Sequence, residues 1–364
     1  MADQNQSTKK EERPRVSIPK RVLIPILVTM SLQFAGSMTI SDFPQLFEGK
    51  LIEDLNLTTQ SVQAMYSVTG IVGLVLDPFI GYVIQSIGFG YSCIIFQFFS
   101  LLGIVATGFA IAYSSFFMLV VSRVVIGVGM DSLWVWQAPA CEKWFSSGSY
   151  MTMAMAINRI VATLITSLTT YVMPIIYVSS GKLTLTVVFP GVICLVCFIG
   201  SILFMLLETK HEKLLEIQGL EDVEKSKQAG RSRARYAHLL KIRPITYAII
   251  LAIFFYPMML RQFTNTMTDF ITVKHGIDFI QAKNLSAFLQ ITRAPFLMIF
   301  STLVTRYGKR SLGLILSPLM HLIGQVIFLL LPTDGQTPIW VLYLTVLFVA
   351  LGDGLYGARH GPAS

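Results

Sequence analysis

Long apolar runs separated by short polar segments are the dominant pattern along the 364 residues of the chain. An α-helix needs about 20 apolar residues to cross a hydrocarbon core of about 30 Å. Ten runs reach roughly this length, so the pattern predicts an all-α polytopic membrane protein. The expected spans are 22–42, 61–86, 92–113, 115–141, 151–178, 184–207, 245–273, 284–306, 311–331 and 338–360.

The predicted spans divide into six and four around a polar segment at 208–244. Six spans followed by a long connector are typical of transporters built from two six-helix halves, which are parallel repeats. Weak internal matches favour such a repeat. They pair Asp77-Pro78-Phe79 with Ala294-Pro295-Phe296, and Gly129 and Pro139 with Gly352 and Pro362. The expected domains are a basic tail at 1–21, a six-helix half at 22–207, a connector at 208–244 with short amphipathic helices around Leu214 and Leu239, and an incomplete four-helix half at 245–364.

The net charge of +8 indicates membrane orientation rather than nucleic-acid binding. Cytoplasmic loops of membrane proteins hold an excess of Lys and Arg. Six basic residues precede the first span, nine lie in the 208–244 segment, and Lys143, Arg306, Lys309 and Arg310 fall on the same side. The N-terminus is therefore expected in the cytoplasm. The opposite side carries only Lys50, Lys182, Lys274 and Lys283.

Nothing in the sequence indicates an enzyme, a cofactor or a metal site. The Cys194-x-x-Cys197 spacing matches redox and zinc motifs, but it lies inside an apolar span, where packing is the simpler interpretation. Phosphate-binding, zinc-protease and serine-hydrolase motifs are absent from the sequence.

Asp131 and Arg159 are opposite charges near the middles of two consecutive predicted spans. A charge at the bilayer centre costs about 2.5 to 3.5 kcal/mol on insertion scales, so it is kept where it lines a cavity or meets a partner. The two residues therefore predict a polar cavity within the membrane.

Further intramembrane charges leave alternatives open. Arg123 lies two helical turns from Asp131, where it either packs structurally or contacts the substrate. In two later spans, Arg261 and Arg293 either pair with Asp77 and Asp269 or indicate a more anionic substrate. Asp77 and Asp269 are also candidates for proton coupling, together with Asp42 and His360.

The fourth span carries a specific motif, R-V-V-I-G-V-G-M-D-S-L-W-V-W-Q from Arg123 to Gln137, followed by the pair Trp144-Phe145. This motif, with Arg159 in the fifth span, resembles the lysosomal dipeptide transporter family called major facilitator superfamily domain-containing protein one. The turn L-V-T-R-Y-G-K-R at 303–310 also resembles the cytoplasmic signature of that superfamily, with Thr305 in place of its acid.

The resemblance implies a twelve-helix transporter fold and a dipeptide or similar zwitterion as substrate. It implies that Asp131 binds the amino group of the substrate and Arg159 binds its carboxylate, with Trp134 and Gln137 beside them. An Arg fork can hold a carboxylate bidentately, which agrees with this assignment. The resemblance also implies an endosomal or lysosomal membrane, with the plasma membrane as the alternative, and leaves room for an accessory membrane subunit.

Several residues have both a structural and a functional interpretation. Trp134 and Trp136 either pack in the core or line a side-chain pocket, and His360 either lines a wall or senses pH. Asn56-Leu57-Thr58 is a glycosylation sequon in a loop predicted to face away from the cytosol.

Two other functions fit the pattern, namely an organic-anion transporter of the same fold and a membrane sensor that does not transport. Because two further helices are expected after the tenth, the sequence also suggests a truncated chain that transports poorly as given.

Overall fold

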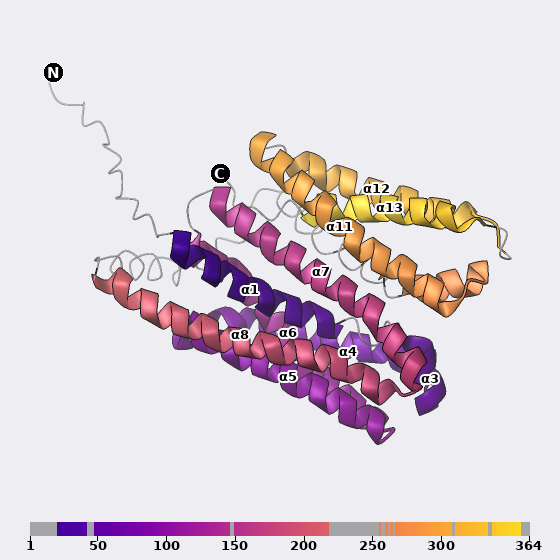
Figure 1. Cartoon of the computed structure of the whole chain (residues 1–364), viewed down its shortest axis with the longest axis horizontal. Coiled ribbons are helices and arrows are strands. Elements are labelled where there is room, and N and C mark those ends of the chain that lie inside the picture. Colours follow the sequence, from indigo (N-terminus) through magenta and orange to yellow (C-terminus); the bar gives the residue numbers. More distant parts are fainter. Residues whose placement is uncertain are drawn as a thin grey trace.

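The computed structural model describes residues 20–41, 47–145, 149–217, 255, 259–260, 263–264, 266–307, 310–333 and 337–357. Within these residues, eight helices are long and apolar enough to cross a membrane, and Ile315–Leu330 is a shorter apolar helix. The predicted seventh span is described only in part, as a helix that ends at His275. Figure 1 shows the long helices running side by side as a bundle.

The described part of the N-terminal half contains six long helices and one short one. Their bounds agree with the predicted spans to within a few residues, except at the end of α8. This helix continues to Ile217, so Leu214 lies on an extension of the sixth span and not on a separate amphipathic helix. The helices are α1 (Lys20–Ser41), α3 (Glu48–Leu55), α4 (Thr59–Ile87), α5 (Phe89–Ala112), α6 (Phe116–Trp144), α7 (Ser149–Ser180) and α8 (Leu183–Ile217).

The C-terminal half contributes α11 (Phe279–Tyr307), α12 (Arg310–Leu330) and α13 (Ile339–Gly357). In Figure 1 these three helices form one layer beside α7, and α7 packs along α11. The Ser167 hydroxyl of α7 donates a buried hydrogen bond of 3.2 Å to the Ala287 carbonyl of α11. The two halves therefore touch along these helices.

Glycines let neighbouring helices approach until their backbones touch. A Cβ atom placed on Gly103 of α5 would lie 2.9 Å from the Ile126 amide nitrogen of α6. A Cβ atom on Gly129 of α6 would lie 2.6 Å from the Phe96 carbonyl oxygen of α5. Lipid tails are as apolar as Leu, so membrane helices associate through close packing of this kind rather than through a hydrophobic driving force.

The same contacts recur in the C-terminal half. Gly324 of α12 meets Val349 of α13 as Gly103 meets Ile126. When α5 is aligned with α12 and α6 with α13, Gly352 corresponds to Gly129. Gly352 lies against the Ser317 carbonyl, and Gly129 lies against the Phe96 carbonyl. The packing of these two helix pairs thus shows the internal repeat. Pro78 and Pro295 do not correspond within it, because Pro78 lies further along α4 than Pro295 does along α11.

Lys143 joins α6, α8 and the start of α5 at one end of the N-terminal half. This end holds the turn between α4 and α5 and is called the Gly88 end. Its ammonium donates to the Glu208 carboxylate of α8 at 3.1 Å and also contacts Glu212. It lies 5.2 Å from the centre of the Phe89 ring at the start of α5. The last turn of α6 is therefore fastened to α8. The opposite end, which holds the turn between α7 and α8, is called the Gly181 end.

We expect Gly103→Ala to lower the thermal unfolding temperature of the purified protein. The added methyl group forces α5 from the backbone of α6, and such overpacking typically costs about 1 to 3 kcal/mol. Gly108→Ala, on the same helix, is the control, since its Cβ would meet only Val187 Cγ1 at 3.8 Å. Equal unfolding temperatures for the two variants would contradict the close approach.

Candidate functional site

Asp131 lies near the middle of α6, on the side that faces α4. Its carboxylate rests on Gly73: a Cβ atom placed on that glycine would lie 2.5 Å from Asp131 Oδ2 and 2.9 Å from Cγ. Gly73 is buried, and Asp131 is half-buried. The acid predicted from the sequence is therefore held at the crossing of two helices within the bundle.

Arg159 of α7 contacts an aromatic ring of α6. Its guanidinium carbon lies 5.4 Å from the centre of the Trp134 ring, within cation–π range. The edge of the Trp134 ring contacts Phe34 of α1, with 4.7 Å between ring centres. Trp134 follows Asp131 by three residues, so both lie on one face of α6. The ring of Trp134 thus contacts one predicted charge, Arg159, and lies on the same face of α6 as the other, Asp131.

The two tryptophans of this segment differ in their surroundings. The indole nitrogen of Trp136 donates to the Phe89 carbonyl at 3.0 Å, and its ring packs edge-on against Phe204. The indole nitrogen of Trp134 is buried and has no hydrogen-bond acceptor among the described residues. Trp136 is therefore a packing residue, while Trp134 has a donor to offer beside Arg159.

Arg123 and Gln137 lie on α6 on either side of Asp131. Arg123 is 2% exposed, and Gln137 is also buried. With a rise of about 1.5 Å per residue, Arg123 stands about 12 Å and Gln137 about 9 Å along the helix axis from Asp131. Neither side chain is therefore brought to the Asp131 carboxylate by the fold of α6 alone.

Arg293 of α11 forms an ion pair with Asp353 of α13. It also donates to Gln290 Oε1 at 3.1 Å. The expected pairing of Arg293 with Asp77 or Asp269 is therefore wrong: Asp353, which is 5% exposed, is its partner. The ring of His321 on α12 is buried in the same region and packs edge-on against Phe263.

Comparison with protein families settles the class of the chain. The model of the Major Facilitator Superfamily matches residues 25–359. The chain belongs to the Major Facilitator Superfamily. It is accordingly a multi-pass membrane transporter, from a superfamily whose members are in general not enzymes.

Curated relatives confirm the resemblance predicted from the motif of α6. The chain is 23% identical to Lysosomal dipeptide transporter MFSD1 of Danio rerio, over 85% of this chain and 68% of the relative. It is 22% identical to Lysosomal dipeptide transporter MFSD1 of Homo sapiens, over 86% of this chain and 68% of the relative.

Solved structures confirm the superfamily fold. The proton:xylose symporter XylE bound to 6-bromo-6-deoxy-D-glucose aligns with a TM-score of 0.71 and 15% identity, over 94% of this chain and 81% of that one. A structure from work on substrate recognition in proton-dependent oligopeptide transporters aligns with a TM-score of 0.64 and 16% identity, over 91% and 81%.

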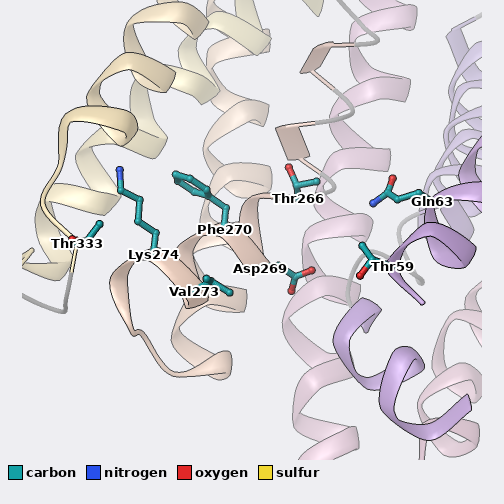
Figure 2. Close-up of a pocket in the computed structure, with 8 residues that line it drawn as sticks. All are labelled: Thr59, Gln63, Thr266, Asp269, Phe270, Val273, Lys274 and Thr333. Carbon is teal, nitrogen blue, oxygen red and sulfur yellow. The ribbon is translucent and has the colours of Figure 1, made fainter. Parts of the chain in front are cut away.

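Within this superfamily fold, Asp269 lines a cavity of about 570 Å³ between the two halves at the Gly181 end. Figure 2 shows its carboxylate facing Thr59, at the start of α4. Lys274 lies on the other side of the cavity, where its ammonium donates to the Phe328 and Leu329 carbonyls at 2.7 and 2.8 Å. The cavity wall also includes Gln63, Thr266, Phe270, Val273 and Thr333.

The remaining candidates are placed apart from these charges or lie outside the described residues. Asp77 is exposed on α4. Asn56 is exposed where α3 ends, with a left-handed backbone of φ 50°. Among the described residues, no group of three His, Cys, Asp or Glu side chains could hold a metal ion, and all four cysteines are buried. The candidates outside the described residues are Asp42, Arg261 and His360.

Sequence reasoning missed three features of the site. It did not connect Asp353 with Arg293, and it overlooked Gly73, which lies against the Asp131 carboxylate, and Tyr356, which is buried on α13. The repeat offered no signal for Asp353, because the alignment of α6 with α13 places Gly354, and not Asp353, opposite Asp131.

We expect Asp353→Ala to destabilise the protein by about 3 to 5 kcal/mol, because removing one partner leaves the other charge buried without compensation. The double variant Arg293→Met with Asp353→Leu should recover most of that loss. Thermal unfolding of the purified protein measures both changes. A double variant no more stable than Asp353→Ala would contradict the ion pair as the source of the effect.

Proposed function

We propose that the chain transports small zwitterionic solutes, most directly dipeptides or amino-acid-like molecules. In this proposal the site lies in mid-membrane between the two halves, which rock to expose it to either side in turn. Asp131 binds the amino group of the solute, and Arg159 binds its carboxylate. The resemblance to transporters named for dipeptides supports this substrate class.

The observation that carries the proposal is the guanidinium of Arg159 over the ring of Trp134, at 5.4 Å. The ring provides a contact for the guanidinium, whose N–H groups can bind a carboxylate in a bidentate manner. The buried indole N–H of Trp134, which has no acceptor among the described residues, supports a third donor to the same carboxylate.

The amino group of the solute requires an anion at a fixed distance from this cationic site. Asp131 and Trp134 lie one turn apart on one face of α6, so the acid and the donor site are about 5 to 6 Å apart at Cβ. This spacing supports a short zwitterion, in which the two charged termini are separated by a small number of bonds. One anion, Asp131, and one cation, Arg159, together match a substrate whose own charges sum to zero.

The organic-anion alternative required an excess of positive charge in the cavity. Arg293 was one of the two cations behind it, and its charge is balanced by Asp353. This pairing favours a neutral zwitterion over an organic anion as substrate.

The proposal also includes an orientation of the protein in the membrane. The N-terminus and the Gly88 end face the cytoplasm, in accord with the distribution of basic residues, and the Gly181 end faces a lumen or the exterior. The cavity beside Asp269 then supports an entrance on that side. By resemblance, the membrane is that of the endosome or lysosome.

We expect Asp131→Asn and Arg159→Ala each to abolish uptake of a radiolabelled alanyl-alanine dipeptide into proteoliposomes, with normal abundance and unfolding temperature. Arg159→Lys should restore little uptake, because an ammonium cannot form the two-pronged contact with a carboxylate. Asp54→Asn and Lys182→Ala, at exposed positions outside the site, are the matched controls.

Trp134→Phe separates the two roles of the indole. It keeps the ring beneath Arg159 and removes the N–H donor, so the half-saturating dipeptide concentration should rise while uptake persists. Full uptake by Asp131→Asn or Arg159→Ala would overturn the proposed site. Inhibition by organic acids that lack an amine, as strong as inhibition by the dipeptide, would overturn the substrate class.

Glycosidase treatment tests the orientation. The protein from cells should shift in gel mobility, and Asn56→Gln should remove the shift, because Asn56 is exposed on the side proposed to face the lumen. Asn5→Gln, in the other sequon near the N-terminus, should leave it unchanged. A shift that depends on Asn5 and not on Asn56 would invert the proposed topology.

A further inference from the structure

The cavity at the Gly181 end has walls from both halves of the protein. Thr59 and Gln63 belong to α4, while the other lining residues belong to the C-terminal half. Its volume of about 570 Å³ lies within the range of sites that hold small solutes, roughly 300 to 1,000 Å³. The cavity is therefore large enough for a dipeptide, and neither Asp131 nor Arg159 lines it.

Oxygen atoms gather on one side of this cavity. Figure 2 shows the Asp269 carboxylate directed towards Thr59, with Thr266 and Gln63 on the same side. A carboxylate, two hydroxyls and an amide carbonyl can all accept hydrogen bonds. A primary ammonium group is a compact cation with three donors, so this wall suits the charged amino group of a solute.

The cations around Asp269 leave room for such a group. The ammonium of Lys274, on the other side of the cavity, donates to the Phe328 and Leu329 carbonyls at the end of α12. Lys283 of α11 is a neighbouring cation of Asp269, and it is 2% exposed. An ionised carboxylate has about four acceptor positions, so Asp269 can keep this neighbour and still bind a second cation from the cavity.

The first turn of α4, which the Asp269 carboxylate faces, has its own cap. The Thr58 hydroxyl accepts a hydrogen bond from the Ser61 amide at 3.2 Å, so the chain that precedes the helix stabilises its start. The carboxylate of Asp269 is therefore not needed as a cap for α4, and it lines the cavity instead.

From this arrangement we propose that the cavity is a second binding site for the solute, an outer site in which Asp269 binds the amino group. Thr59, Gln63 and Thr266 accept the remaining hydrogen bonds of the ammonium. The identity of the solute rests on the proposed function, and the outer site is additional to the site at mid-membrane. Because the wall belongs to both halves, rocking of the halves changes its width. The outer site is therefore complete only when the Gly181 end is spaced as it is in this structure.

Binding of alanyl-alanine to the purified protein, measured by isothermal titration calorimetry, tests the outer site. The unaltered protein should bind two molecules and Asp131→Asn one. Asp269→Asn should also bind one, and the double variant should lose measurable binding. The N-acetylated dipeptide should bind the Asp131→Asn protein more weakly than alanyl-alanine by a factor of about ten or more, since it lacks the charged donor.

Two further variants, each combined with Asp131→Asn, show whether the loss is specific. Asp278→Asn removes a carboxylate that is exposed at the same end, does not line the cavity and accepts from the Ile280 amide at 3.2 Å. An amide oxygen can accept the same bond, so this control should keep the outer site. Thr59→Val removes a hydroxyl from the facing wall and should weaken binding by about threefold to tenfold. The unfolding temperature of each variant verifies that it is folded.

The outcomes separate the outer site from the proposed function. A single bound molecule in the unaltered protein, lost in Asp131→Asn and retained in Asp269→Asn, would overturn the outer site and leave the proposed function standing. Two bound molecules and full uptake in Asp131→Asn would overturn the mid-membrane site, and loss of one molecule in Asp269→Asn would still support the outer site. Equal affinity of the Asp131→Asn protein for the dipeptide and its N-acetylated form would overturn the role of Asp269.

Discussion

Every charge inside the hydrocarbon must meet an opposite charge, a dipole or water, and the two halves meet this requirement differently. In the C-terminal half, Arg293 and Asp353 satisfy each other across two helices. In the N-terminal half, the Arg159 guanidinium lies within cation–π range of the Trp134 ring, and the Asp131 carboxylate lies against Gly73. Two helices of the C-terminal half are thus joined by an ion pair, and in the N-terminal half an aromatic ring and a glycine lie against the charges. The two halves of the repeat therefore surround their intramembrane charges with different groups.

The asymmetry depends on helices that approach until their backbones touch. In each half, paired glycines lock the third helix of the repeat to the fourth, as Gly103 and Gly324 show. Because these contacts fix the rotation of α6 and α13 about their axes, they also fix the direction in which Asp131 and Asp353 face. Fixed charges in a low-dielectric interior need little rearrangement when a ligand arrives.

Hydropathy alone predicted most of the fold, because each span shows its length and polarity independently of its neighbours. The end of α8 was missed, since the helix continues beyond the apolar run, where Glu208 is held by Lys143. Asp131 and Arg159 could be proposed from the sequence because charges stand out within apolar runs. The partner of Arg293 could not, because a sequence shows several carboxylates and not which of them a helix crossing brings near.

The Lys143 contact has a mechanical consequence. It fastens the last turn of α6, the helix that carries Asp131, to α8, the helix that leads into the connector between the halves. A displacement of the last turn of α6 relative to α8 must therefore break or stretch the contact between Lys143 and Glu208.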